Sequence, residues 1–326
     1  ALRPVFLVEH LAELLAHKNN SVINRRLDFL AQLPSVATFK RQSDGTLGSI
    51  ASLWAYEAEF AVSNGRAPTR EDLSGIIAEN IILQTESGDT PWLLDFIEEA
   101  RRSSIKRRRD VSIIRMPPLV DPKETVFSFF SRGRRSAGDR EKQFAKLAAI
   151  AEINAERRGD KRISDPKEVG LYMLQSLREM SEQIGDRMTL EQVTQLQNIP
   201  SDYVKPKTTI SEFLRLGWVG GHSKVLADHT GLPQIRLFEA VECGFCPTFN
   251  VLEGLEQHRD MGQRSSGGAI IDRNFISCSR YIDLVYADAQ SNDCVRRAKK
   301  SNQFAASVGR VKATTGMSGV LSDCLC

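Results

Sequence analysis

The chain has 326 residues, of which 41% are hydrophobic and 26% are charged, and its formal net charge is +3. These proportions are typical of a soluble globular protein with one large domain or two ordinary ones. No apolar run approaches the roughly 18 residues of a membrane span, so we expect no membrane partner. All six Cys lie in the last third, without the dense spacing of a secreted disulfide scaffold, which favours a reduced, cytoplasmic setting.

Helices dominate the predicted elements of the first two-thirds of the chain. We expect helices over residues 5–16, 21–33, 47–62, 139–158, 164–184 and 189–196. A short strand is expected at 36–39, after Pro34. Thr69 is followed by two acids, which predicts a capped helix that ends near Leu83. Pro91 begins a further helix that runs into a basic cluster.

The last third of the chain differs, because short β-type runs occur among its helices. We expect helices over 211–216, 223–229, 233–242, 247–258, 269–280 and 290–300, and strands over 281–287 and 306–311. A strand, a helix and a second strand at this spacing predict a βαβ unit with a parallel sheet. The sequence therefore predicts an α/β fold.

Acidic residues stand at the positions where such a fold places its chemistry. Asp288 follows the first predicted strand of the pair, and the carboxyl ends of strands are the usual sites in α/β folds. Asp272 lies early on the preceding helix, where the helix dipole favours an anion. Carboxylates that converge in this way can bind Mg²⁺ or Mn²⁺ for phosphodiester hydrolysis. The alternative is ordinary structure, with Asp272 as a first-turn acid, Asp288 as a helix cap and Glu13 as an exposed residue.

Two segments carry a resemblance to a known family. The first is Asp272-Arg-Asn-Phe-Ile-Ser-Cys-Ser-Arg-Tyr-Ile-Asp283-Leu-Val-Tyr-Ala-Asp288, and the second is Val5-Phe-Leu-Val-Glu-His10-Leu-Ala-Glu13. Together they resemble the PIN (PilT N-terminus) nuclease family in its bacterial PIN-like branches, over roughly residues 3–65 and 230–312. The resemblance implies a PIN-like parallel sheet flanked by helices, with a mostly α-helical insertion. The implied division is 1–100 and 210–326 as two parts of the PIN-like domain, with 101–209 as the basic helical insertion.

The resemblance also implies a site and an activity. Glu13, Asp272 and Asp288 match the catalytic, metal-binding acids of the family, and Asp283 matches a recurrent acid that we include among the metal ligands. The implied activity is Mg²⁺- or Mn²⁺-dependent cleavage of RNA, less often DNA, by activated water, as in a toxin or defence effector. Two features depart from the pattern: the first strand of the family ends in an Asp that would precede Ala1, and Phe275 stands where a His is frequent.

Positive charge is concentrated between residues 101 and 140, which hold twelve Lys or Arg against four acids. This density predicts a polyanion partner, although a solvated helix face would look similar. The candidate nucleic-acid-binding residues are Lys106, Arg107, Arg108, Arg109, Arg132, Arg134 and Arg135. A non-catalytic nucleic-acid-binding or assembly protein on a degenerate PIN-like scaffold is therefore the alternative function. A purely protein-binding helical domain, a homo-oligomer and a partner protein also remain open.

One cysteine pair leaves open whether the chain binds zinc as a second metal. Cys243-Gly-Phe-Cys246 has the spacing of half a zinc site, but no second Cys pair or spaced His pair completes it. The alternative is that these cysteines serve as small buried hydrophobes.

Overall fold

The computed structural model describes residues 5, 7–31, 36–39, 48–81, 91–114, 121–131, 137–159, 163–184, 189–258 and 268–313. Contacts divide the chain into two compact units. The first unit comprises Ala1–Arg107, Cys243–Asp260 and Gly267–Cys326, and the second comprises Arg108–Glu242 and Met261–Ser266. Residues 210–242 therefore cluster with the middle of the chain, whereas the sequence analysis assigned them to the C-terminal segment. None of the helices described is long and apolar enough to cross a membrane.

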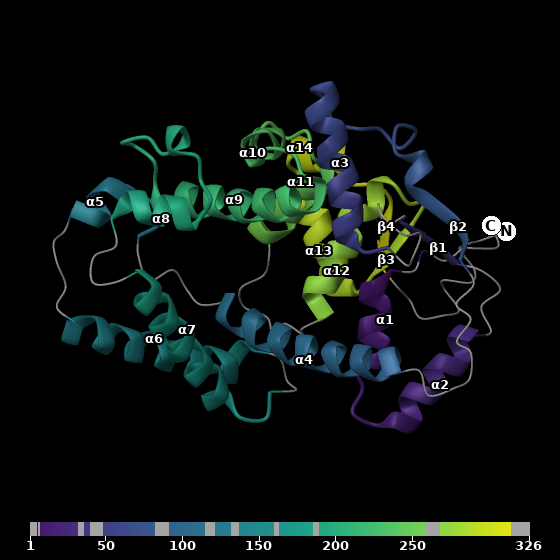
Figure 1. Ribbon diagram of the computed structural model, residues 1–326, viewed down its shortest axis with the longest axis horizontal. Coiled ribbons are helices and arrows are strands. Elements are labelled where there is room, and N and C mark those ends of the chain that lie inside the picture. The colour runs from purple at the N-terminus through teal and green to yellow at the C-terminus, as the bar shows by residue number, and fades with distance from the viewer. Residues whose placement is uncertain are drawn as a thin grey trace. The chain divides into compact units, whose positions relative to one another are not determined.

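The first unit combines elements from both ends of the chain (Figure 1). Its N-terminal elements are α1 (Val8–Leu15), α2 (Asn20–Ala31), β1 (Val36–Phe39), α3 (Ile50–Asn64), the 3-10 helix η1 (Ser74–Ile76), β2 (Ile77–Ile81) and α4 (Pro91–Ile114), which ends in the second unit. Its C-terminal elements are α11 (Pro247–Gln257), α12 (Gly268–Ser277), η3 (Cys278–Arg280), β3 (Val285–Ala287), α13 (Ala289–Ala298), α14 (Asn302–Ser307) and β4 (Val311–Ala313).

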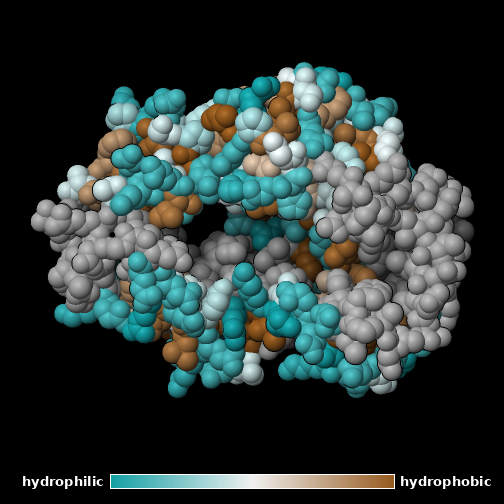
Figure 2. Space-filling model, viewed as in Figure 1, coloured by the Kyte–Doolittle hydropathy of each residue, from teal (hydrophilic) through white to brown (hydrophobic). Residues whose placement is uncertain are grey.

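The second unit is helical in its described residues. Its elements are α5 (Val126–Ser131), α6 (Ala137–Arg158), α7 (Pro166–Ile184), α8 (Leu190–Leu196), η2 (Ser201–Tyr203), α9 (Ile210–Thr230) and α10 (Gln234–Glu242). Helices α6 and α7 pack through a small core of Ala151, Ala155 and Val169. Figure 2 shows hydrophilic residues over much of the coloured surface. Leu171 and Leu214 are nevertheless each 66% exposed, so some large apolar side chains of this unit face solvent.

The described strands form two small sheets in the first unit. Strands β1 and β2 are antiparallel. Strands β3 and β4 are parallel, with Val285 opposite Val311 and Ala287 opposite Ala313. The predicted parallel pair is thus confirmed, and the chain is mostly helical with a small parallel sheet, which is compatible with an α/β class. Within the described ranges, the strands do not form the larger parallel sheet that a PIN-like fold implies.

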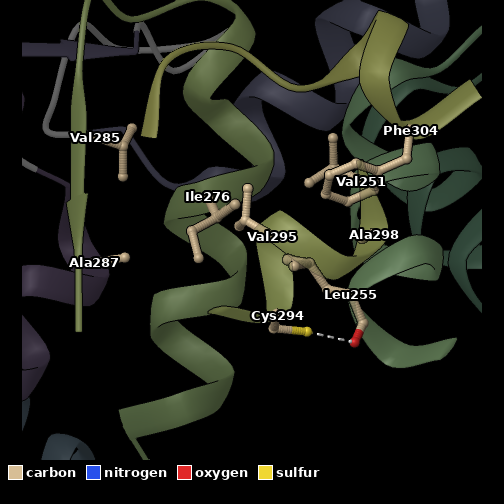
Figure 3. Packing of buried hydrophobic residues seen from close by; sticks show 9 residues of the cluster. All are labelled: Val251, Leu255, Ile276, Val285, Ala287, Cys294, Val295, Ala298 and Phe304. Atoms are coloured by element: carbon tan, nitrogen blue, oxygen red, sulfur yellow. Dashed lines mark hydrogen bonds between the residues drawn. The ribbon is translucent and has the colours of Figure 1, made fainter. Parts of the chain in front are cut away.

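The parallel pair rests on a buried apolar core, which Figure 3 shows at close range. Its nine residues come from α11, α12, β3, α13 and α14 and are Val251, Leu255, Ile276, Val285, Ala287, Cys294, Val295, Ala298 and Phe304. The Cys294 thiol donates a hydrogen bond to the Leu255 carbonyl at 3.3 Å. Gly254 admits the Phe304 ring, since a Cβ there would lie 2.3 Å from the ring. The packing therefore fixes the position of β3 and of the residue that follows it.

A second core joins the two ends of the chain within the first unit. It is built from Leu7, Phe39, Ile50, Leu53, Leu73, Ile76, Cys278 and Tyr281. Phe275 and Ile282 pack against both cores. Because α12 contributes to both, its orientation is set from two sides.

Several predicted elements were wrong in type or extent. The helix predicted after Thr69 is instead a turn, η1 and strand β2. Thr69 and Asp72 do exchange capping hydrogen bonds, at 2.8 and 3.3 Å, but the chain then buries Leu73 and Ile76 in the second core rather than continuing as a helix. Local capping chemistry was present, and tertiary packing overrode it.

The bounds of other elements shifted for identifiable reasons. The strand predicted at 281–287 begins only at Val285, because Tyr281 is buried in a turn. The strand predicted at 306–311 runs from Val311 to Ala313, after α14. The two helices predicted at 211–216 and 223–229 form the single helix α9. Gly220 lies inside α9, where a Cβ would be 2.3 Å from the Gln197 carbonyl oxygen, so glycine there permits close packing.

Candidate functional site

Helix α1 is anchored at its first turn, which sets the direction of Glu13. The Leu7 N–H donates to Nδ1 of His10 at 3.1 Å, and this bond caps the helix. One turn earlier than Glu13, the Glu9 carboxylate accepts the Ile50 N–H at the start of α3, at 3.0 Å. Glu13 itself is exposed. The first turn of α1 is therefore fixed, and Glu13, one turn later, is exposed to solvent.

Helix α12 meets α1 through an aromatic contact. The imidazole of His10 stacks on the ring of Phe275, with ring centroids 3.7 Å apart and planes within 6°. Residues three apart lie on the same face of a helix. Glu13 follows His10 by three residues, and Asp272 precedes Phe275 by three. Glu13 therefore lies on the face of α1 that carries His10, and Asp272 lies on the face of α12 that carries Phe275.

Asp288 lies at the carboxyl end of β3 and is the N-cap of α13. Its backbone is extended, and its carboxylate accepts the Ser291 N–H at 2.6 Å. The structure thus confirms both that Asp288 ends the strand and that it caps the next helix. A carboxylate has two oxygens and about four lone-pair positions, so capping one helix leaves acceptor capacity for another group.

The pKa of Asp272 is shifted by the charges of the other two acids. Its pKa is raised from the ordinary 3.8 to about 7, first by burial, then by the negative charge of Asp288, and then by that of Glu13. Like charges interact in this way only when they are close and incompletely screened. The structure therefore brings Glu13 and Asp288 within electrostatic reach of Asp272, although Glu13 and Asp272 are 259 positions apart in the sequence.

The convergence stops short of a formed metal site. Over the part of the chain that the structure describes, no three His, Cys, Asp or Glu side chains are arranged so that one metal ion could bind all of them. Asp283 is oriented elsewhere, because its carboxylate pairs with the Arg70 guanidinium at 2.6 Å. That contact lowers the pKa of Asp283. The fourth predicted ligand thus has a cationic partner of its own.

A second buried acid, Glu57 on α3, was not predicted from the sequence. It is fully buried, and its carboxylate accepts the Thr248 N–H at 3.1 Å, the Tyr281 hydroxyl at 2.5 Å and the Thr248 hydroxyl. Burial raises the pKa of Glu57 to about 7, although these hydrogen bonds lower it. The available signal was an acid within the apolar face of α3, near Leu53 and Ala61.

Glu57 has a structural task, because it caps α11 from another helix. Cys246 is the N-cap residue of α11, and its side chain makes no capping bond. The Glu57 carboxylate satisfies the N–H of Thr248 instead, in the first turn, where the helix dipole also favours an anion. This contact joins α3 to α11 inside the first unit.

The described part of the basic segment is engaged in contacts within the protein. Arg109 pairs with Glu168 at 3.2 Å and lies over the ring of Tyr172. Lys106 is exposed on α4. The side chains of Arg107 and Arg108, and all of Arg132, Arg134 and Arg135, lie outside the described residues. Only two of the seven candidate nucleic-acid-binding side chains can therefore be placed. Arg109 already has an acidic and an aromatic partner, whereas Lys106 is exposed.

The cysteine pair does not resemble a zinc half-site. Cys243 is exposed, whereas Cys246 is buried. Burial, followed by the charge of Glu57, raises the pKa of the Cys246 thiol well above its ordinary value. Zinc binds the thiolate, so these surroundings disfavour a metal at Cys246 and favour its use as a small buried hydrophobe.

The chain was compared with models of protein families, with curated proteins and with solved structures, and none of them matches it.

Proposed function

We propose that this chain is a metal-dependent hydrolase of phosphodiester bonds in RNA, on a PIN-like scaffold. The observation that carries the proposal is the raised pKa of Asp272, which Asp288 and Glu13 push upward together. Asp288 and Glu13, from opposite ends of the sequence, thus lie close enough to shift the pKa of Asp272. Such perturbed carboxylates are more frequent at functional sites than elsewhere.

The physical argument rests on repulsion. Acids that raise the pKa of a neighbouring carboxylate lower the stability of the folded chain at neutral pH, so the charges near Asp272 have a cost. A divalent cation would offset that cost. The donors are all carboxylate oxygens, which Mg²⁺ and Mn²⁺ prefer, so the chemistry of Asp272, Asp288 and Glu13 fits these ions. The cation would supply charge neutralisation and an oriented water at the phosphate.

The residues themselves have distinct tasks in this proposal. Asp272 is half-buried, its pKa is raised to about 7, and it would be one of the ligands of the cation. Asp288 is fixed by its bond to the Ser291 N–H, so its carboxylate stays at the end of β3. Glu13 and Asp288 are both exposed, so a substrate in solvent can reach them. Exposed cations such as Lys106 on α4 suit the phosphates of a polyanion.

The test is cleavage of labelled single-stranded RNA by the purified chain with Mn²⁺, Mg²⁺ or EDTA. Asp272→Asn and Asp288→Asn should each lower the rate more than about 100-fold, because each removes a charge that the cation needs. Asp283→Asn is the matched control, since Asp283 pairs with Arg70, and it should retain activity. Equal rates in wild type and both site variants would contradict the proposal.

A second function has its own supporting observation. The described residues contain no three-membered ligand group, and one oxygen of Asp288 is already used by a helix cap. Both facts suit a nucleic-acid-binding or assembly protein that has lost catalysis. RNA binding without cleavage under any metal would support it. Lys106→Ala removes one cation that would contact a phosphate. The slope of log K against log salt concentration should therefore become shallower by about one.

A further inference from the structure

Positive charge is concentrated in the last elements of the first unit, outside the basic segment of residues 101–140. Residues 289–313 hold six Lys or Arg and one acid, Asp293. Five of these cations lie at the end of α13 or directly before β4. We call them the α13 basic surface, and they are Arg296, Arg297, Lys299, Lys300 and Arg310.

The end of α13 carries its cations on the face opposite its buried residues. Val295 and Ala298 are buried in the apolar core below the helix. Lys299 and Lys300 follow Arg296 by three and four positions, so the three side chains share one face. The side chain of Arg296 is 80% exposed, and both lysines are exposed as well. Three cations are therefore open to a partner in solvent.

Arg310 lies at the same edge of the parallel pair as the end of α13. It is exposed directly before β4, and its carbonyl accepts the Val285 N–H at 3.0 Å, where β3 begins. A crossover helix returns the chain to the edge at which parallel strands begin. In Figure 3, α13 rises from Cys294 to Ala298, whereas β3 descends. The fold therefore brings Arg310 to the cations of α13.

The single acid of this segment compensates only part of the charge. Asp293 pairs with Arg296 at 2.7 Å and with Arg297 at 3.2 Å. The helix dipole also favours cations in the last turn, which gives the two arginines a structural role. Among the described residues, neither Lys299 nor Lys300 makes an ion pair. Their charge exceeds what the helix end requires.

A chain of phosphates is the partner that suits this surface. Lysine and arginine side chains that neutralise phosphates release bound counterions, which drives binding of nucleic acid without regard to base sequence. An anionic membrane surface is bound most firmly when apolar side chains insert beside the cations. Val295 and Ala298 of α13 point into the core instead. A nucleic-acid strand therefore fits this surface better than a lipid surface does.

We propose that the α13 basic surface binds the phosphate backbone of single-stranded RNA, independently of base sequence. The inference rests on the proposed function only for the choice of RNA as the polyanion, and it requires no metal ion. Asp288 caps the opposite end of α13, about 16 Å from Lys299 at 1.5 Å per residue. A strand that contacts both would span about five phosphates.

The experiment is fluorescence anisotropy of labelled oligouridine and oligoadenosine of equal length, with EDTA present and over a range of salt concentrations. Lys299→Gln combined with Lys300→Gln should weaken binding about 25-fold at about 0.1 M salt, because each phosphate contact adds about 0.7 to the slope of log K against log salt concentration. That slope should become shallower by about 1.4, and by about 0.7 in Arg310→Gln. Both oligonucleotides should respond alike.

A matched control removes the same charge from the second unit. Lys205 and Lys207 are exposed, and Lys205→Gln combined with Lys207→Gln should stay within about twofold of wild type. Equal losses in the two double variants would show that net charge, rather than the α13 basic surface, decides binding. Thermal unfolding of all variants should match wild type, since each substituted side chain is exposed.

The remaining outcomes separate this inference from the proposed function. If wild type cleaves RNA with Mn²⁺ but the variant of Lys299 and Lys300 binds RNA as tightly as wild type, this inference falls and the proposed function stands. If no metal supports cleavage but that variant loses RNA binding in EDTA, the surface stands and the hydrolase falls. A loss of binding to vesicles that contain phosphatidylserine, with RNA binding unchanged, would identify a lipid surface as the partner and overturn the inference.

Discussion

Two carboxylates of the first unit have a pKa raised to about 7, and their surroundings are opposite. Glu57 is fully buried and accepts hydrogen bonds from Thr248 and Tyr281. Asp272 is half-buried, and the groups that shift its pKa, after burial, are the acids Asp288 and Glu13. Burial is the largest cause of both raised pKa values, but hydrogen-bond donors oppose the rise at Glu57, whereas like charges add to it at Asp272.

The difference separates a structural acid from a candidate functional one. The donors around Glu57 complete its hydrogen bonding inside the protein, and its task, capping α11, is fulfilled within the fold. The acidic neighbours of Asp272 add repulsion, which raises its pKa further. Removing the first acid should therefore harm stability, whereas neutralising the second should improve the stability of the metal-free chain and harm metal binding.

The largest expected effect is the loss of Glu57. Glu57→Ala leaves the Thr248 N–H and hydroxyl and the Tyr281 hydroxyl without their acceptor and adds a cavity, so we expect a loss of about 3–5 kcal/mol in unfolding free energy. Glu57→Gln should lose less, because one amide oxygen can still accept the N–H and hydroxyls can accept as well as donate. Urea unfolding at pH 7 measures both. Equal losses would show that the carboxylate, rather than side-chain volume, decides the contribution, because Gln keeps the volume that Ala removes.

Tyr281→Phe tests a single hydrogen-bond donor to Glu57. It removes the hydroxyl that donates to Glu57 at 2.5 Å and should cost about 1–3 kcal/mol. The loss should be greater at pH 8, where Glu57 is ionised, than at pH 5, where it is protonated, because the donor stabilises the charged form. Denaturant unfolding at the two pH values measures the difference. A loss that does not depend on pH would contradict the charge-stabilising role.

Asp272→Asn should have the opposite sign. Since the folded-state pKa of Asp272 is raised from 3.8 to about 7, the folded chain binds more protons than the unfolded chain between those values. Stability of the metal-free protein therefore falls as pH rises from about 4 to 7. Asn avoids this loss, so the variant should be more stable than wild type by about 1–2 kcal/mol at pH 8, with a difference that shrinks toward pH 4. A destabilised variant at pH 8 would contradict the repulsion.

Part of this arrangement was accessible from the sequence. The strand at 36–39 and the parallel pair followed from local patterns, and Asp288 was correctly placed at the end of a strand. Asp272 and Asp288 were chosen from their positions and by resemblance, and Glu13 by resemblance; the charges of Glu13 and Asp288 reach Asp272 in the structure. Local sequence predicted these features because each depends on residue type and spacing over a few residues.

The remainder depends on contacts that no local pattern encodes. Glu57 meets Thr248 and Tyr281 across 191 and 224 residues. His10 stacks on Phe275, a residue that the sequence analysis noted only because it replaced a frequent His. The pairing of Asp283 with Arg70 spans 213 residues. Side chains of this kind are placed by the tertiary fold, and one sequence gives no measure of which distant segments meet.

The smallest expected effect concerns the pair of Arg70 and Asp283. It adds a third acid to the comparison of Glu57 with Asp272. Asp283 is 87% exposed and Arg70 is 47% exposed, so water screens their attraction. Arg70→Ala should therefore change the unfolding free energy by no more than about 0.5 kcal/mol. It should also let the pKa of Asp283 rise toward its ordinary value, which carbon-13 NMR titration of the carboxyl group can follow. Because Asp283 pairs with Arg70, removing Arg70 frees this carboxylate. Mn²⁺ affinity should stay unchanged if Asp283 is no ligand; a marked gain would place Asp283 among the metal ligands after all.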